Sequence, residues 1–221
     1  MKLKLLFIIV ASGVFSSLEA QTSKGDWMLG GSLNYYINHD IRSNPPSTDK
    51  NIYKNQGFDI SPQVGKFVKK NLVVGMNLSY RRSYWTNNLE STDELIFRQK
   101  STTASIGAFT RKYFSISEQV FLFAQADIGY FNRINSDVSS PNTEERELRT
   151  NGLQLKGYGG IAYFPKKWLA IEALISPIGY SYSVQKENEP NVESRTNIHD
   201  LNIGINTTSI FLGVNFFINK Q

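Results

Sequence analysis

Asp127 and Glu172 are two carboxylates that could in principle serve as a general acid and a general base. Such a pair works only when both groups lie close together and within reach of a reacting group. The sequence places neither residue near the other or near a nucleophile. A buried network of ion pairs and hydrogen bonds is therefore our interpretation of both side chains, and we predict no catalytic residue and no cofactor.

The two histidines occur in matching contexts, Asn38-His39-Asp40 and Ile198-His199-Asp200. Imidazole and carboxylate ligands suit zinc-like ions, so His39, Asp40, His199 and Asp200 are candidate metal ligands. His39 follows Trp27 by 12 residues, whereas His199 precedes Phe217 by 18. On neighbouring strands this is a mismatch of about 20 Å, unless a stagger of the strands absorbs it. We predict no metal site and interpret both residues as loop-edge histidines.

The composition excludes other kinds of chemistry. The 221 residues include no cysteine, which removes disulfides, thiol nucleophiles and thiolate metal sites. The formal net charge of +5 is distributed over short basic pairs such as Lys69-Lys70 and Lys166-Lys167, and no long basic arm is present. Nucleic acid is therefore not a predicted partner.

The first residues predict a secretory signal peptide. Lys2 and Lys4 precede the apolar run at residues 5–10, and Leu18-Glu19-Ala20 offers a processing site with a small residue before the cut. We predict a signal peptide over residues 1–20 and a mature chain over residues 21–221. The apolar run is short for a membrane-anchoring helix.

The mature chain alternates apolar and polar residues with period two, which is typical of β-strands. In Leu72, Val74, Met76, Leu78 and Tyr80, for example, the apolar residues are separated by small or polar ones. The pattern predicts eight strands, at about residues 27–38, 58–64, 72–80, 97–114, 122–130, 153–163, 169–175 and 198–218.

The connections between these strands alternate between long and short. Long polar loops are predicted near residues 39–54, 83–95, 133–151 and 185–197, and short turns near residues 69–71, 115–118 and 165–167. Strands joined by short turns are antiparallel, so the four long loops lie at one end of the sheet and the three turns at the other. Long outer loops and short periplasmic turns are typical of outer-membrane barrels.

The alternation by itself does not say which face points inward, so a soluble barrel with an apolar interior is a competing interpretation. The polar face carries charges of both signs, which could neutralise one another in a closed lumen. Aromatic residues near strand ends would meet lipid headgroups, among them Trp27, Tyr80, Phe97, Tyr130, Tyr163 and Phe216. We therefore predict an outward apolar face.

This assignment gives two sets of residues. The predicted lipid-facing residues are Leu72, Val74, Met76, Leu122, Ile128, Ile171, Ile210, Leu212, Val214 and Phe216. The predicted lumen network comprises Asp59, Asn77, Asp127, Lys156 and Glu172.

With these features the chain resembles the small outer-membrane β-barrel family, the eight-stranded OmpA/OmpX type. The resemblance covers about residues 26–218 and includes the aromatic-rich terminal strand at residues 209–217. It implies an all-β, antiparallel, up-and-down transmembrane barrel in the outer membrane of a Gram-negative cell. It also implies outer-membrane lipid as surroundings and recognition of the last strand by the barrel-assembly machinery. Here Ile218-Asn219-Lys220-Gln221 follow the last aromatic residue, which departs from that signal.

The predicted function is a structural or surface-interaction role without catalysis. An eight-stranded barrel is just wide enough for side chains to fill its interior, so no aqueous channel is expected. The projecting strand ends and the charged loop at residues 135–150 could bind a surface or envelope protein, or the loop is charged only because it is solvated. Three alternatives remain open: a component of an envelope secretion or assembly apparatus, an outer-membrane lipid-modifying hydrolase, and a soluble periplasmic ligand-binding barrel.

Overall fold

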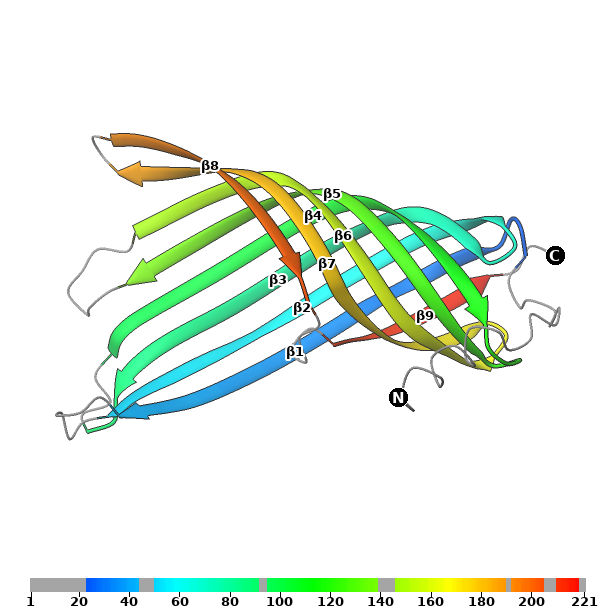
Figure 1. Ribbon diagram of the computed structural model, residues 1–221, viewed down its shortest axis with the longest axis horizontal. Helices are drawn as coiled ribbons and strands as arrows, with labels where there is room; N and C mark the ends of the chain where they lie inside the picture. Colours follow the sequence, from blue (N-terminus) through cyan, green and yellow to red (C-terminus); the bar gives the residue numbers. More distant parts are fainter. Residues whose placement is uncertain are drawn as a thin grey trace, which may run out of the picture.

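The computed structural model describes residues 23–43, 50–91, 95–138, 146–189, 192–204 and 210–218 (Figure 1). The regular elements in these ranges are all β-strands. They are β1 (Trp27–Ser43), β2 (Lys50–Lys69), β3 (Leu72–Leu89), β4 (Leu95–Ser115), β5 (Val120–Val138), β6 (Arg146–Lys166), β7 (Leu169–Glu189), β8 (Val192–Ile203) and β9 (Phe211–Ile218). No helix in the described part of the chain is long and apolar enough to cross a membrane.

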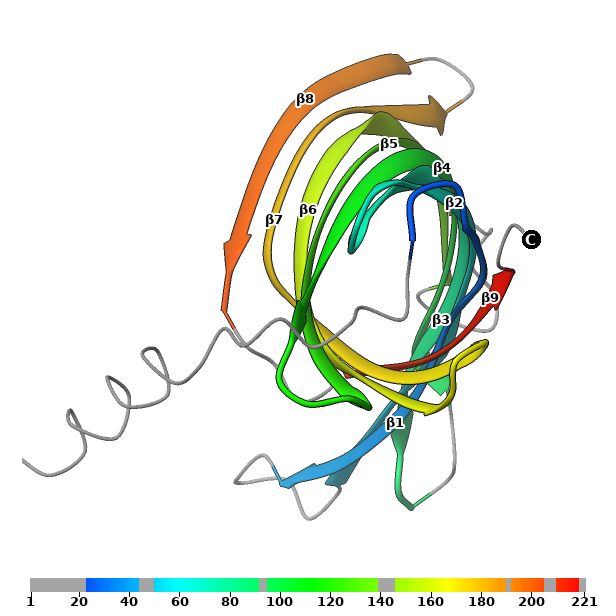
Figure 2. The same ribbon diagram turned by 90° about the vertical axis from the view of Figure 1, so that its right-hand side faces the viewer.

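The strands close into an antiparallel ring. From β1 to β7 each strand pairs with the next, and β9 pairs with both β7 and β1. Trp27 lies opposite Ile218, so the first and last described strands meet at the end of the ring that carries the short turns. Figure 2 shows the ring from one end. The predicted all-β, antiparallel, up-and-down barrel is confirmed.

The eighth predicted strand is divided into β8 and β9. The first part of β7, Leu169–Leu174, pairs with β9. From Ile178 onward β7 pairs with β8. We expected the first and last strands to be neighbours in a closed barrel. In the described residues, however, β1 pairs with β9 only as far as Leu33, and β8 pairs only with β7. Both views show β8 and the outer part of β1 diverging (Figures 1 and 2).

The long loops are shorter than the sequence predicted. Strand β1 continues to Ser43 and β2 begins at Lys50, and β5 continues to Val138 before β6 begins at Arg146. Much of the predicted loop at residues 135–150 is therefore strand, and residues 139–145 lie outside the described residues. The physical reason is that most residues on both sheet faces are polar at this end, with only scattered apolar ones such as Ile41, so the regular alternation that signals a strand disappears there.

The three short turns occur where the sequence predicted them. They join β2 to β3, β4 to β5 and β6 to β7. In the first turn Asn71 has a φ of 61°, a left-handed conformation that asparagine tolerates better than most residues. These turns define the turn end of the barrel, and the opposite end is called the loop end below.

Glycines on the inner face make room for aromatic side chains near the turn end. A Cβ at Gly75 would lie 2.6 Å from the Cα of Gly65 and 2.7 Å from Cε1 of Phe109. A Cβ at Gly160 would lie 2.5 Å from Cζ of Phe123. These glycines therefore allow neighbouring strands to hold large rings inside a narrow ring of strands.

Candidate functional site

The interior of the barrel holds a polar cavity of about 50 Å³. All five residues of the predicted lumen network line it, together with further polar side chains from other strands. The lining includes Asp59, Asn77, Asp127, Lys156 and Glu172, and also Gln63, Arg81, Arg111, Gln125 and Tyr158. Because successive residues of a strand point to opposite faces, the lining residues of each strand are separated by residues that point outward.

Arg111 and Glu172 form the most buried ion pair in the described part of the chain. Nη1 of Arg111 lies 2.7 Å from Oε2 of Glu172, and each side chain is 1% exposed. The guanidinium also lies 4.4 Å from the centre of the Phe123 ring. An ion pair removed from water needs further hydrogen bonds to offset the loss of hydration.

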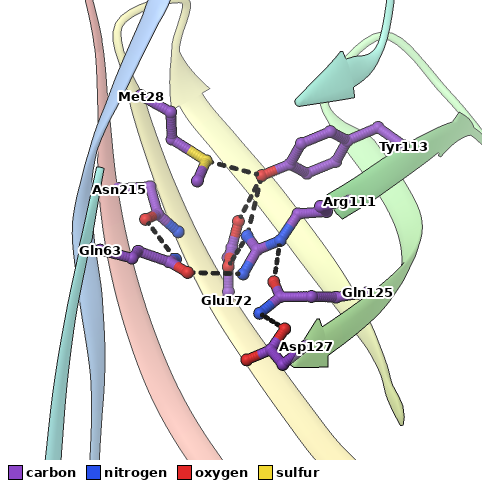
Figure 3. Close-up of polar contacts among 8 residues, drawn as sticks. All are labelled: Met28, Gln63, Arg111, Tyr113, Gln125, Asp127, Glu172 and Asn215. Atoms are coloured by element: carbon purple, nitrogen blue, oxygen red, sulfur yellow. Dashed lines mark hydrogen bonds and ion pairs between the residues drawn. The ribbon is translucent and has the colours of Figure 1, made fainter. Parts of the chain in front are cut away.

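Neighbouring side chains supply these bonds (Figure 3). Nε of Arg111 donates to Oε1 of Gln125 at 2.5 Å, and its Nη1 donates to the Tyr113 hydroxyl at 2.9 Å. The Tyr113 hydroxyl in turn donates to Oε1 of Glu172 at 3.0 Å. Gln125 continues the network by donating to Asp127 at 2.8 Å. The two carboxylates considered first, Asp127 and Glu172, thus belong to one hydrogen-bonded network.

A second ion pair lies at another part of the cavity. Nη2 and Nε of Arg81 lie 2.7 and 2.8 Å from Oδ2 of Asp59, and Ser61 donates to Oδ1 of the same carboxylate at 2.9 Å. Sequence reasoning did not single out Arg81 or Arg111. Their parity within the alternating strands places both on the inner face, and that signal could have identified them.

We expect Tyr113→Phe to lower the free energy of unfolding by about 1–3 kcal/mol. The substitution keeps the ring but removes the hydroxyl that bonds both Arg111 and Glu172. Urea unfolding of the folded barrel in lipid vesicles measures this change. Tyr130→Phe is the control, because its hydroxyl bonds Asn151 on the exposed outer face. Equal effects of the two substitutions would contradict the network's contribution.

The turn end of the interior is filled by apolar and aromatic side chains, which sequence reasoning did not predict. The cluster, called the aromatic floor here, includes Met28, Phe67, Val73, Phe109, Tyr113, Phe121, Phe123, Ala162, Phe164, Ala170, Leu174 and Phe217. Every strand of the ring contributes to it. The ring centroid of Phe164 lies 5.0 Å from that of Phe121 and 5.1 Å from that of Phe217. Consecutive apolar residues, as in Phe121-Leu122-Phe123 and Phe216-Phe217, were the available signal, because both faces are apolar there.

The outward face is apolar. Nine of the ten residues predicted to face lipid are exposed on it, and Leu72, at the first turn, is partly buried. The exposed ones are Val74, Met76, Leu122, Ile128, Ile171, Ile210, Leu212, Val214 and Phe216. Around the polar cavity the structure therefore places charged groups inside and apolar groups outside, unlike a soluble barrel with an apolar interior.

Aromatic side chains border this apolar band at both ends. Trp27, Phe114, Tyr163, Trp168 and Phe216 lie toward the turn end, and Tyr35, Phe58, Tyr80, Tyr130, Tyr180 and Tyr182 toward the loop end. Phe97 was predicted to join the border. It instead packs against Trp85, with ring centroids 5.0 Å apart. Trp85 lines a pocket together with Asn38 and Asp40.

The four candidate metal ligands are not brought together. No group of three or more His, Asp or Glu residues in the described ranges could hold a metal ion. His39 is on β1 opposite Lys54, and Asp40 lies 3.6 Å from Arg42. His199 is on β8, where its Nδ1 lies 2.9 Å from the Tyr180 hydroxyl. Asp200 lies opposite Ser181 of β7. Because β1 and β8 do not pair in the described residues, the segments that contain His39 and His199 are not on neighbouring strands.

No protein-family model matches the chain. No curated protein matches it either. Among solved structures, the outer membrane protein OprG from Pseudomonas aeruginosa is similar over 91% of this chain and 100% of its own, with 11% identity and a TM-score of 0.44. Neisserial surface protein A is similar over 87% of this chain and 97% of its own, with 11% identity and a TM-score of 0.38. The translocator domain of the autotransporter NalP from Neisseria meningitidis is similar over 90% of this chain and 62% of its own, with 14% identity and a TM-score of 0.44.

Proposed function

We propose that this chain is an integral outer-membrane β-barrel protein with a structural or surface-interaction role. The observation that carries the proposal is the height of the outward apolar band. On β1 the band spans nine residues between the aromatic border residues Trp27 and Tyr35, and on β5 it spans nine residues from the apolar Leu122 to the border residue Tyr130. A tilted strand of about 9–11 residues crosses the hydrocarbon core of a bilayer.

The closed ring suits this environment for a second reason. Backbone amides in the hydrocarbon core have no water as a partner, and a closed ring satisfies them between strands. In the proposed orientation the short turns and the Trp27–Ile218 pair lie in the periplasm, and the loop end lies outside the cell. Strand β9 would be the segment read by the barrel-assembly machinery.

The surface-interaction role is supported by the projecting ends of the strands. Strands β4, β6 and β7 have 21 residues each, about twice the number that the membrane requires. Among the described strands, β8 has one unpaired edge, and so does β1 beyond Leu33. Five of the outward apolar residues on the strands beside this opening are 63–72% exposed, more than the other outward apolar side chains: Tyr35, Ile37, Leu201, Ile203 and Leu212. An extended segment of a partner protein could pair with such an edge.

Localisation is tested by fractionation of cells followed by gel migration with and without boiling. We expect heat-dependent migration in the outer-membrane fraction. Recovery of a folded protein in the aqueous fraction would contradict the proposal and favour the soluble barrel.

Strand-edge recognition is tested with a photo-crosslinking amino acid placed at Asn197 on β8. The control position is Ser136 on β5, which is paired on both sides with β4 and β6. We expect one reproducible crosslinked polypeptide from Asn197 in intact cells and none from Ser136. Equal crosslinking at both positions, or none at either, would leave only the structural role.

A further inference from the structure

We propose that the polar cavity inside the barrel binds a small anion, a carboxylate or phosphate group, with Lys156 and Arg81 as its principal donors. This goes beyond the anchoring and surface role proposed above. The aromatic floor borders the cavity on one side, and the lining residue Arg81 has a side chain that is 44% exposed. Its volume of about 50 Å³ leaves room for one small group, because a single water molecule needs only about 10–15 Å³ of such space.

The carboxylates that line the cavity have their oxygens occupied. Both oxygens of Glu172 accept a hydrogen bond, from Arg111 and Tyr113. Both oxygens of Asp127 accept one, from the side-chain amides of Gln125 and Asn77 at 2.8 and 2.7 Å. A cation entering the cavity would have to displace these bonds.

Asp59 is occupied in the same way. Its Oδ2 accepts from Arg81, and its Oδ1 accepts from Ser61 at 2.9 Å and from Ser79 at 3.5 Å. All three carboxylates of the lining therefore have partners within the protein, and they offer little to a cation.

The hydrogen-bonding capacity that remains is that of donors. Lys156 faces the cavity, and no described residue forms a hydrogen bond or a close ion pair with its ammonium group. Its electrostatic neighbours include Arg81 and Arg133 as well as Asp59 and Asp127. Arg81 uses Nε and Nη2 for Asp59, so its Nη1 has no described acceptor. The unused N–H groups of Lys156 and Arg81 are best satisfied by anionic acceptor oxygens.

The test is isothermal titration calorimetry of the folded full-length barrel in non-ionic detergent. Sodium acetate and sodium phosphate are the probes, and each is compared with sodium chloride at equal ionic strength. We expect saturable binding of at least one probe to the wild type. Lys156→Met is expected to weaken it at least tenfold, and Lys156→Arg, which keeps the charge, to retain it.

Lys54→Met is the matched control, because Lys54 is exposed on the outer face of β2 and is expected to leave binding unchanged. Heat-dependent gel migration verifies that each variant is folded. If Lys156→Met does not fold, the side-chain NMR signal of Lys156 in the wild type is followed during the titration. No saturable binding of either probe, equal binding by the Lys156→Met variant, or a Lys156 signal that does not move would overturn the proposal.

Discussion

Replacing Ala126 with arginine is expected to lower the free energy of unfolding in lipid vesicles by about 2–4 kcal/mol. Ala126 is exposed on the outer face of β5, four residues from Leu122 and four from Tyr130, at the middle of the apolar band. Its paired neighbours are Thr110 and Gly157, so a longer side chain meets little steric resistance. The expected loss therefore reports the cost of placing a charge in hydrocarbon.

The matched control is Ser136→Arg on the same face of the same strand. Ser136 lies six residues beyond Tyr130, outside the proposed membrane span, and its paired neighbours are Lys100 and Glu147. We expect a change below about 0.5 kcal/mol. Urea unfolding of the protein folded into vesicles measures both variants. If arginine were tolerated equally at the two positions, the outward apolar band would not face lipid.

Arg111→Met is expected to destabilise the barrel by about 3–5 kcal/mol. The substitution leaves the carboxylate of Glu172, which is 1% exposed, without its cationic partner. It also removes the donor to Gln125 and the cation above the Phe123 ring. Glu172→Leu is expected to have a comparable effect, because it leaves the guanidinium of Arg111 buried without an anion.

The double variant separates the ion pair from its surroundings. In Arg111→Met combined with Glu172→Leu no unpaired charge of this pair remains, so we expect the double variant to cost about 2–3 kcal/mol less than the sum of the single variants. The same urea measurement gives all three values. Strict additivity would show that the two charges do not stabilise one another.

Much of the outward face could be predicted from sequence because β-strands have a period of two. In Val74, Met76 and Leu78 the apolar residues alternate with inward Gly75 and Asn77, and one face is therefore defined without knowledge of any strand partner. The same parity placed Asp59, Asp127 and Glu172 inside. The positions of the turns followed from breaks in the pattern, as at Lys70-Asn71.

Alternation fails where both faces have the same surroundings. Beyond the apolar band most residues on both faces of β1 and β5 are polar, so residues 39–43 and 133–138 were interpreted as loops although they continue the strands. Near the turn end both faces are apolar, and the inward rings of Phe121 and Phe217 could not be distinguished from outward ones.

The sequence by itself determined the strand parity, the order of antiparallel strands and the outward apolar band, because these depend on local periodicity and on the length of connections. Only the tertiary structure decided which inward groups are partners. Arg111 and Glu172 are 61 residues apart in the chain, and they meet because β4 and β7 lie on different parts of one closed wall. The division of the last strand, which leaves β8 paired only with β7 and keeps His39 and His199 on strands that do not pair with each other, likewise depends on how the ring closes. Such contacts depend on the stagger of the whole barrel, which no single strand encodes.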